Sequence, residues 1–354
     1  MLEESPSDSS VDDPILLGNL PIDIALPNET LSAIFDQLSP AALSVLSRVS
    51  QRFRAVAERA LYASISITDA LSESSPVPFK TLRCCQTLFA HRHLANGAKK
   101  LHIRWQSRSS SQSLNHLAPA LQALRDALYN LAALESLELG LGPANILNEA
   151  GVHILERIID GCAFPNLRQC AFSADWAKGS PPYSNILAAF LTAHPSLRQL
   201  RLSDHHGPVS LPPEALPHLS SFRGSPDAAA SILPGRPVTV LALVGQDSDV
   251  TRVNLPRMAH TSVPLHQLDL SAMSVRPVLL QNVSAILPGV RVLKVKLALR
   301  HTLHYALSGI TSPRPPSMAL DTRTPPKSCL CVPRGTPHAY LCEGYGFPPG
   351  TSGS

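Results

Sequence analysis

The sequence is poor in aromatic residues, in excess charge of either sign and in long apolar runs. Phe, Trp and Tyr make up 5% of the 354 residues, so leucine and alanine supply most of the apolar mass. This balance favours helices and repeats over an aromatic-rich β-sandwich. No run approaches the roughly 18 uncharged apolar residues of a membrane helix, so no membrane partner is expected. The net charge of +4 is small and spread out, which argues against nucleic-acid binding.

The number of cysteines is odd, and the first residues lack a basic side chain. Seven cysteines without regular spacing are typical of reduced thiols in an intracellular protein. The first thirteen residues carry five acidic side chains and no basic one. That composition argues against a secretory or mitochondrial leader. We therefore expect a cytoplasmic or nuclear protein, and the sequence does not separate the two.

Proline, by contrast, is abundant at 33 residues and marks turns and unstructured segments. The acidic, Ser-rich residues 1–19 and the Pro-, Ser- and Gly-rich residues 300–354 are predicted to be disordered. A linker is predicted over residues 68–80. No capping repeat is recognisable after Val290, which leaves open whether the tail is native or reflects a truncation or an imperfect gene model.

Short segments with alternating leucines recur between residues 81 and 299. The pattern Leu-x-x-Leu-x-Leu is typical of the strand of a leucine-rich repeat. From Leu134 onward the segments start 19 to 33 residues apart, against about 20–29 in regular repeats. The segments are KLHIRW at Lys100, LESLELG at Leu134, LRQCAFS at Leu167, LRQLRLS at Leu197, LSSFRGS at Leu219, VTVLALVG at Val238, LHQLDLS at Leu265 and VRVLKVKL at Val290.

Apolar residues at helical spacing lie between these segments and predict helices over 114–131, 147–159, 186–191 and 278–287. Strands that alternate with helices are typical of the α/β class. The sequence therefore predicts an irregular leucine-rich-repeat horseshoe over residues 81–299.

A compact helical block precedes the repeats and opens with LPNETLSAIFDQLS, residues 26–39. Asn28 is a possible N-cap, and the apolar residues that follow fall on one helix face. Ser39 and Pro40 then restart the chain as N-cap and first helical position. Three short helices cannot bury all these apolar side chains against one another. They need a cover, which is either the repeat domain or a partner protein.

The ordered set LPNETLSAIFDQLSPAALSVLSRVSQRFRAVAERALY resembles an F-box. That family shows Leu-Pro, an acidic residue, spaced apolar positions and a Val-Ser followed by an aromatic residue, here Phe53. The closing Leu61-Tyr62, before an Ile-x-Ile strand, resembles fungal F-box proteins with degenerate repeats. Many F-boxes carry an acidic residue where this chain has Ala41 or Ala42, and a Trp in place of Phe53; these are tolerated variations that can weaken binding.

The resemblance implies an F-box at residues 20–67 that docks on a Skp-type adaptor and, through it, on a cullin. The remaining chain, residues 81–299, would select a protein substrate for ubiquitination. The resemblance implies a non-catalytic receptor, and no cofactor is expected. The residues expected to supply the adaptor contact or the core beneath it are Leu26, Pro27, Leu31, Ile34, Phe35, Leu38, Leu43, Leu46 and Val49.

In a repeat horseshoe, the strand residues between the leucines face the concave side. Here they are polar and of mixed sign, without base-stacking aromatics, which favours a protein partner over nucleic acid. The basic residues among them form no obvious cluster, so the sequence does not indicate whether recognition depends on phosphorylation. The predicted substrate contacts are Glu138, Gln199, Arg201, Arg223, Asp269 and Lys294; Ser136, Gln169, Gln267 and Lys296 belong to the same set.

Two alternatives stay open at this point. The same repeats with the helices as a cap would make an interaction scaffold without ligase association, and adaptor binding separates the two. An enzyme is favoured only if Asp204, His205 and His206 converge with other polar residues in a deep pocket. A polar repeat loop is the simpler interpretation of that motif.

Two cysteine patterns do not indicate a site. The vicinal pair Cys84-Cys85 lies in a helix-like segment and is typical of a packed surface rather than a redox pair. A later group holds zinc-ligand residue types, but its Cys-x-Cys spacing is tighter than the usual C-x₂₋₄-C, so no metal is expected. That group comprises Cys329, Cys331, His338 and Cys342.

Overall fold

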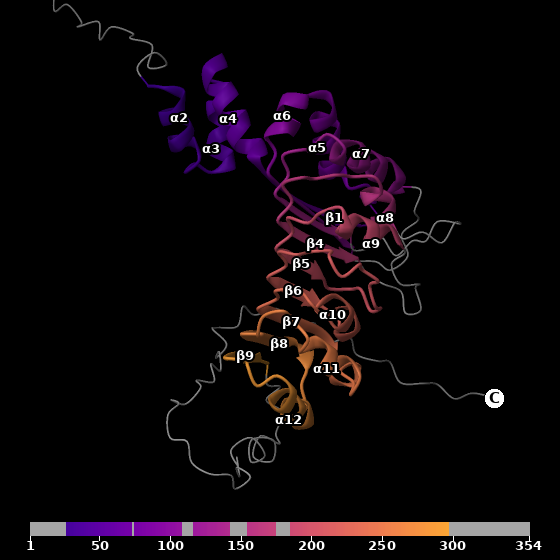
Figure 1. Ribbon diagram of the computed structural model, residues 1–354. Coiled ribbons are helices and arrows are strands. Elements are labelled where there is room, and N and C mark those ends of the chain that lie inside the picture. Colours follow the sequence, from indigo (N-terminus) through magenta and orange to yellow (C-terminus); the bar gives the residue numbers. More distant parts are fainter. Residues whose placement is uncertain (1–25, 73, 108–115, 142–153, 175–184, 297–354) are drawn as a thin grey trace, which may run out of the picture.

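A computed structural model of the protein describes residues 26–72, 74–107, 116–141, 154–174 and 185–296. The segments predicted to be disordered, 1–19 and 300–354, lie outside these residues, as does the cysteine group of the tail. In the described part, three helices lead into nine parallel strands with helices between them (Figure 1). The fold is therefore of the mixed α/β class that the sequence predicts.

The three N-terminal helices lie at the β1 end of the sheet in Figure 1, and α12 lies near the opposite end. The first three helices are α2 (Asn28–Phe35), α3 (Pro40–Leu46) and α4 (Gln51–Ala63). The strands are β1 (Ser64–Leu71), β2 (Lys100–Ser107), β3 (Ser136–Leu141), β4 (Gln169–Ala174), β5 (Gln199–Leu202), β6 (Ser221–Gly224), β7 (Val240–Gln246), β8 (Gln267–Ser274) and β9 (Val292–Val295). The later helices are α5 (Phe79–Ala90), α6 (Arg92–Gly97), α7 (Ala118–Leu128), α8 (Ile154–Ile159), α9 (Asn185–Thr192), α10 (Pro226–Ile232), η2 (Asp247–Asp249), α11 (Asn254–Met258) and α12 (Pro277–Ile286).

Serine side chains begin helices α3 and α4. Ser39 Oγ and Ser50 Oγ each accept a hydrogen bond from the backbone N–H three residues ahead, at 3.3 and 3.1 Å, which satisfies an orphan donor of the first turn. The N-cap predicted at Asn28 is wrong, because Pro27 holds that position and Asn28 is the first helical residue. The Asn28 side chain instead accepts a hydrogen bond from Arg52 Nε at 2.8 Å, which ties α2 to α4.

Each strand pairs in parallel with its neighbours in sequence, so the strand order runs from β1 to β9. One register row joins a residue of every strand. From β3 onward its members are separated by the same intervals as the leucine segments of the sequence. The row consists of Ile65, Leu101, Leu137, Cys170, Leu200, Phe222, Leu241, Leu268 and Leu293.

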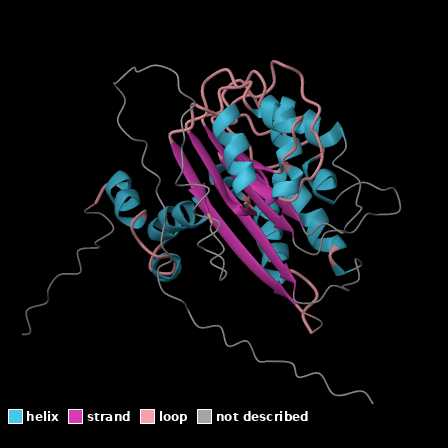
Figure 2. Ribbon diagram, turned by 90° about the horizontal axis from the view of Figure 1, so that it is seen from below, coloured by secondary structure: helices cyan, strands magenta, loops and turns pink. Residues whose placement is uncertain are grey.

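The helices that connect the strands lie on one face of the sheet (Figure 2). Successive side chains of a strand point to opposite faces, so alternate residues meet these helices. In β3, for example, Leu137, Leu139 and Leu141 are buried while Glu138 is partly exposed. The apolar residues therefore fill one continuous core between sheet and helices, and the other face of the sheet is left to polar side chains.

A buried polar network joins the first strand to the helix that follows it. The Asp69 carboxylate accepts hydrogen bonds from Lys80 N–H at 3.1 Å, Thr81 N–H at 3.0 Å and Thr81 Oγ1 at 2.7 Å. Trp105 Nε1 donates in turn to Thr81 Oγ1 at 3.0 Å. Asp69 thus caps α5 from a neighbouring strand, and the network links β1, α5 and β2. The predicted linker, 68–80, begins inside β1 and ends inside α5.

Two histidines are buried beside the sheet. His194 Nδ1 lies 2.6 Å from the Phe190 carbonyl, and His194 Nε2 accepts a hydrogen bond from Phe164 N–H at 2.9 Å. This arrangement requires a neutral ring with its proton on Nδ1. Burial lowers the pKa of His194. Burial also lowers the pKa of His205 to about 4, and the neighbouring His206 adds to that effect.

Replacing Asp69 with alanine leaves the first N–H groups of α5 without an acceptor in a buried place. We expect the Asp69→Ala variant to lower the free energy of unfolding by about 1–3 kcal/mol. Urea unfolding followed by circular dichroism measures this loss. The exposed Asp160, whose carboxylate makes no hydrogen bond among the described residues, provides the control Asp160→Ala. Equal stability of the two variants would contradict the capping role.

Acid should destabilise the protein through His205. Its pKa is about 4 in the folded chain and about 6.5 in the unfolded chain, so the unfolded chain binds the proton first as the pH falls. The stabilisation is complete above about pH 6.5 and is lost towards pH 4. Between pH 7.5 and 5 we expect His205 to account for about 2 kcal/mol of lost unfolding free energy.

Urea unfolding at both pH values tests this expectation with two matched variants. The His205→Asn variant should lose about 2 kcal/mol less than the wild type over this range. The variant His218→Asn, at an exposed position, should follow the wild type. An identical pH dependence of His205→Asn and wild type would show that another group is responsible.

Candidate partner-binding surfaces

The three N-terminal helices pack around a small core of their own. Its buried members are Leu31, Phe35, Leu43, Val56 and Ala57. The rings of Phe35 and Phe53 meet edge to face, with centroids 5.5 Å apart. This core is separate from the larger core beneath the sheet. The helices are joined to the sheet chiefly through α4, which runs directly into β1 and packs on α6.

The nine residues predicted for the adaptor contact differ in exposure, and this difference separates core positions from surface positions. The buried residues are Leu31, Phe35 and Leu43; the half-buried ones are Leu26, Leu38 and Leu46; the exposed ones are Pro27, Ile34 and Val49. The buried residues hold the three helices together. The exposed residues are available to a partner without any rearrangement of the block.

Exposed branched apolar side chains are concentrated in this block. Ile34 exposes 44% of its surface, Val45 67% and Val49 63%. Val45 was not predicted as a contact, because Leu43, Leu46 and Val49 follow one helix face and Val45 lies off it. The signal that could have identified it is an apolar residue between two core positions of a short helix. The other exposed large apolar side chains in the described part of the chain are Phe79, Phe89, Tyr129, Val253 and Val278.

The second surface is the face of the sheet opposite the helices. All six predicted substrate contacts lie there, because each occupies a strand position that alternates with the buried row. Five of them share one register row. Gln199 lies two residues before Arg201 on β5, where it pairs with Gln169 of β4 and Ser221 of β6. The shared row consists of Ser66, His102, Glu138, Ala171, Arg201, Arg223, Ala242, Asp269 and Lys294.

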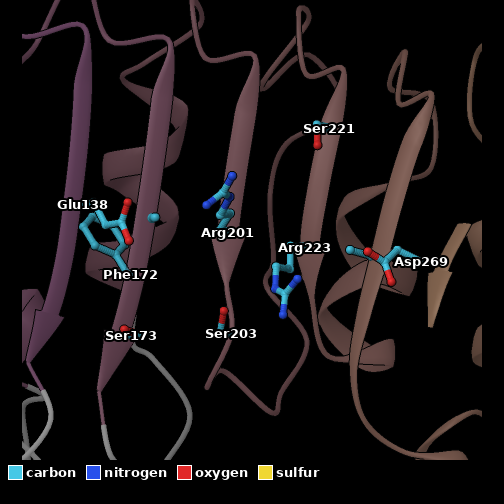
Figure 3. A pocket seen from close by; sticks show the side chains of 10 residues that line it. Glu138, Phe172, Ser173, Arg201, Ser203, Ser221, Arg223 and Asp269 are labelled. Atoms are coloured by element: carbon cyan, nitrogen blue, oxygen red, sulfur yellow. The ribbon is translucent and has the colours of Figure 1, made fainter. Parts of the chain in front are cut away.

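A hollow of about 320 Å³ lies on this face between Glu138 and Asp269 (Figure 3). Ala171 and Ala242 occupy two positions of the row within it, and their short side chains leave room between the longer ones. These alanines were not among the predicted contacts, although they stand at the same repeat position as the charged residues. The remaining lining residues are Phe172, Ser173, Arg201, Ser203, Ser221 and Arg223.

The charged groups of this face are unevenly paired. Glu138 Oε1 lies 3.6 Å from His102 Nε2, and Asp269 Oδ1 accepts a hydrogen bond from Ser271 N–H at 2.9 Å. Arg201 and Arg223, 22 residues apart in the chain, are register partners on β5 and β6. The expectation that the basic residues form no cluster is therefore wrong for this pair.

The residues weighed for catalysis or metal binding do not come together in the described chain. His205 is buried and His206 is exposed, so the two neighbouring rings do not face one site. Burial raises the pKa of the Cys84 thiol to about 11 and that of Cys85 to about 12, so both are protonated at neutral pH. Among the described residues, no three His, Cys, Asp or Glu side chains are grouped as metal ligands.

None of the helices described is long and apolar enough to cross a bilayer.

Comparison with known proteins identifies the N-terminal block. A family model described as F-box-like matches residues 24–68. The matched range contains α2, α3, α4 and the first residues of β1. A search of curated proteins found no match. The chain therefore carries an F-box-like domain at residues 24–68.

Proposed function

We propose that the protein is the substrate-recognition subunit of a Skp–cullin–F-box ubiquitin ligase. Its F-box-like domain binds a Skp-type adaptor and, through it, a cullin, while the sheet binds a protein substrate. The chain itself does no covalent chemistry. It holds the substrate close to a ubiquitin-charged enzyme and so raises the effective concentration of the substrate at that enzyme.

The observation that carries this proposal is the self-contained core of the N-terminal helices. A plain cap on the repeats would bury its apolar face against the core of the sheet. Here the two cores are separate, and Ile34, Val45 and Val49 remain exposed. Covering these side chains with a partner removes apolar surface from water, at roughly 25 cal/mol per Å². An adaptor provides that cover.

We propose further that residues 81–299 form an irregular leucine-rich-repeat horseshoe. The sequential strand order, the leucine-rich register row and the helices on one face support this architecture. Each repeat then buries its apolar face against its neighbours. The open face of the sheet becomes the concave side, where the row from His102 to Lys294 meets the substrate.

An interaction scaffold without ligase association is the second candidate. It would use the same open face of the sheet, with its polar row and its hollow. The two candidates differ only in whether the N-terminal helices bind an adaptor, so adaptor binding is the property to measure.

Co-expression of the full chain with a Skp-type adaptor, followed by pull-down, tests the adaptor contact. We expect the double variant Ile34→Asp/Val45→Asp to reduce capture at least tenfold, because it places two charges in a desolvated contact. The matched control is Val253→Asp/Val278→Asp. It introduces the same charges at side chains that are 71% and 64% exposed and lie outside the F-box-like domain. Circular dichroism of each variant checks that the chain stays folded.

Capture of the wild type and of the control, with loss of the Ile34/Val45 variant, supports the ligase receptor. A folded wild type that does not capture the adaptor would reject the proposal and leave the scaffold. Equal loss in both variants would show that the exposed residues of α2 and α3 are not the contact.

A further inference from the structure

Two positive side chains stand side by side in the middle of the open sheet face. Arg201 and Arg223 are direct register partners on adjacent parallel strands, which lie about 4.8 Å apart. Arg201 is exposed and Arg223 is half-buried. Like charges at directly opposed positions destabilise a sheet. The pair therefore destabilises the sheet, and the fold itself does not require arginine at these two positions.

No carboxylate among the described residues offsets this cost. Glu138 and Asp269 share the register row, but Ala171 and Ala242 intervene, so each carboxylate is two strands from the nearer arginine. Both carboxylates have closer contacts elsewhere, at His102 and at the Ser271 N–H. Within the described part of the chain, neither guanidinium of the pair makes a hydrogen bond or an ion pair.

The two guanidinium groups also lie at different positions along the strand direction. In Figure 3 that of Arg201 is turned towards the beginning of the strands, and that of Arg223 is turned towards their ends, on the side of Ser203. Each guanidinium offers a planar fork of N–H donors that fits two oxygens of a carboxylate or a phosphate. The hydroxyls of Ser203 and Ser221 add further donors at the edge of the hollow.

We propose that this hollow binds an anionic side chain of the protein partner, a carboxylate or a phosphate, held between Arg201 and Arg223. The proposal rests on the function proposed above, since it names the chemistry of the substrate that the sheet recognises. Glu138 and Asp269, at the two ends of the hollow, would repel further negative charge. The site thus fits one anionic residue in a peptide better than the continuous phosphates of a nucleic acid.

Titration of the full chain, labelled with ¹⁵N at arginine, tests the site without knowledge of the substrate. Inorganic phosphate and acetate are added at an ionic strength kept constant with chloride. The single variants Arg201→Gln and Arg223→Gln assign the two side-chain Nε–Hε signals. Both signals should shift together and reach saturation, and in each single variant the remaining signal should saturate only at a phosphate concentration at least tenfold higher.

Two exposed arginines outside the hollow, Arg198 and Arg291, provide the reference. Shifts of Arg201 and Arg223 that are no larger than those of Arg198 and Arg291 would overturn the proposal. Tighter binding of phosphate than of acetate supports a phosphorylated side chain as the ligand. Equal binding of both anions supports an aspartate or a glutamate.

Adaptor capture separates this inference from the proposed function. The variant Arg201→Gln/Arg223→Gln should capture a Skp-type adaptor as well as the wild type, because both side chains lie outside the F-box-like domain. Adaptor capture without anion binding by the wild type would reject the anion site alone. Anion binding by a wild type that captures no adaptor would reject the ligase role and keep the site.

Discussion

The register of the parallel sheet is the constraint on which the other features of the structure depend. Backbone hydrogen bonds between neighbouring strands hold corresponding residues of successive repeats in line, from Ile65 in β1 to Leu293 in β9. Because side chains alternate between the two faces, this alignment buries one row of leucines under the helices. It also brings the residues between those leucines onto one open face. Shifting one strand by a single residue would exchange the two rows.

This constraint explains how far the sequence could predict the fold. The leucine segments predict β2 to β9, and the intervals between them are the register of the sheet. Position within a segment also predicts the face, and Glu138, Arg201 and Asp269 lie together on the face opposite the helices. Local patterns of this kind depend only on residues that are close in the chain.

The features that the sequence did not predict depend on contacts between distant segments. The pairing of Arg201 with Arg223 was not predicted, although each is the fifth residue of its leucine segment, because it depends on two consecutive repeats forming adjacent strands. The cap of α5 comes from Asp69 in the preceding strand and not from a residue beside the helix. Asn28 likewise is the first residue of α2 and not its cap, and its side-chain oxygen accepts a hydrogen bond from Arg52 of another helix.

The F-box-like domain and the sheet have separate cores but share one continuous element. Helix α4 runs into β1, and the Ala63 carbonyl at this junction accepts a hydrogen bond from Lys99 N–H at 3.0 Å, just before β2. The domain is therefore fixed to the first two strands. A partner bound at α2 and α3 would occupy one end of the molecule and leave the hollow on β3 to β8 accessible (Figure 1). This separation would allow the adaptor and the substrate proposed above to bind at the same time.

Hydrogen–deuterium exchange of the full chain, alone and with a Skp-type adaptor, tests the central claim most directly. The claim is that the adaptor covers the exposed apolar residues of the F-box-like domain and leaves the sheet free. It predicts slower exchange within residues 28–49 on adaptor binding and unchanged exchange in β3 to β8. Slower exchange in the strands, with no change in residues 28–49, would contradict it.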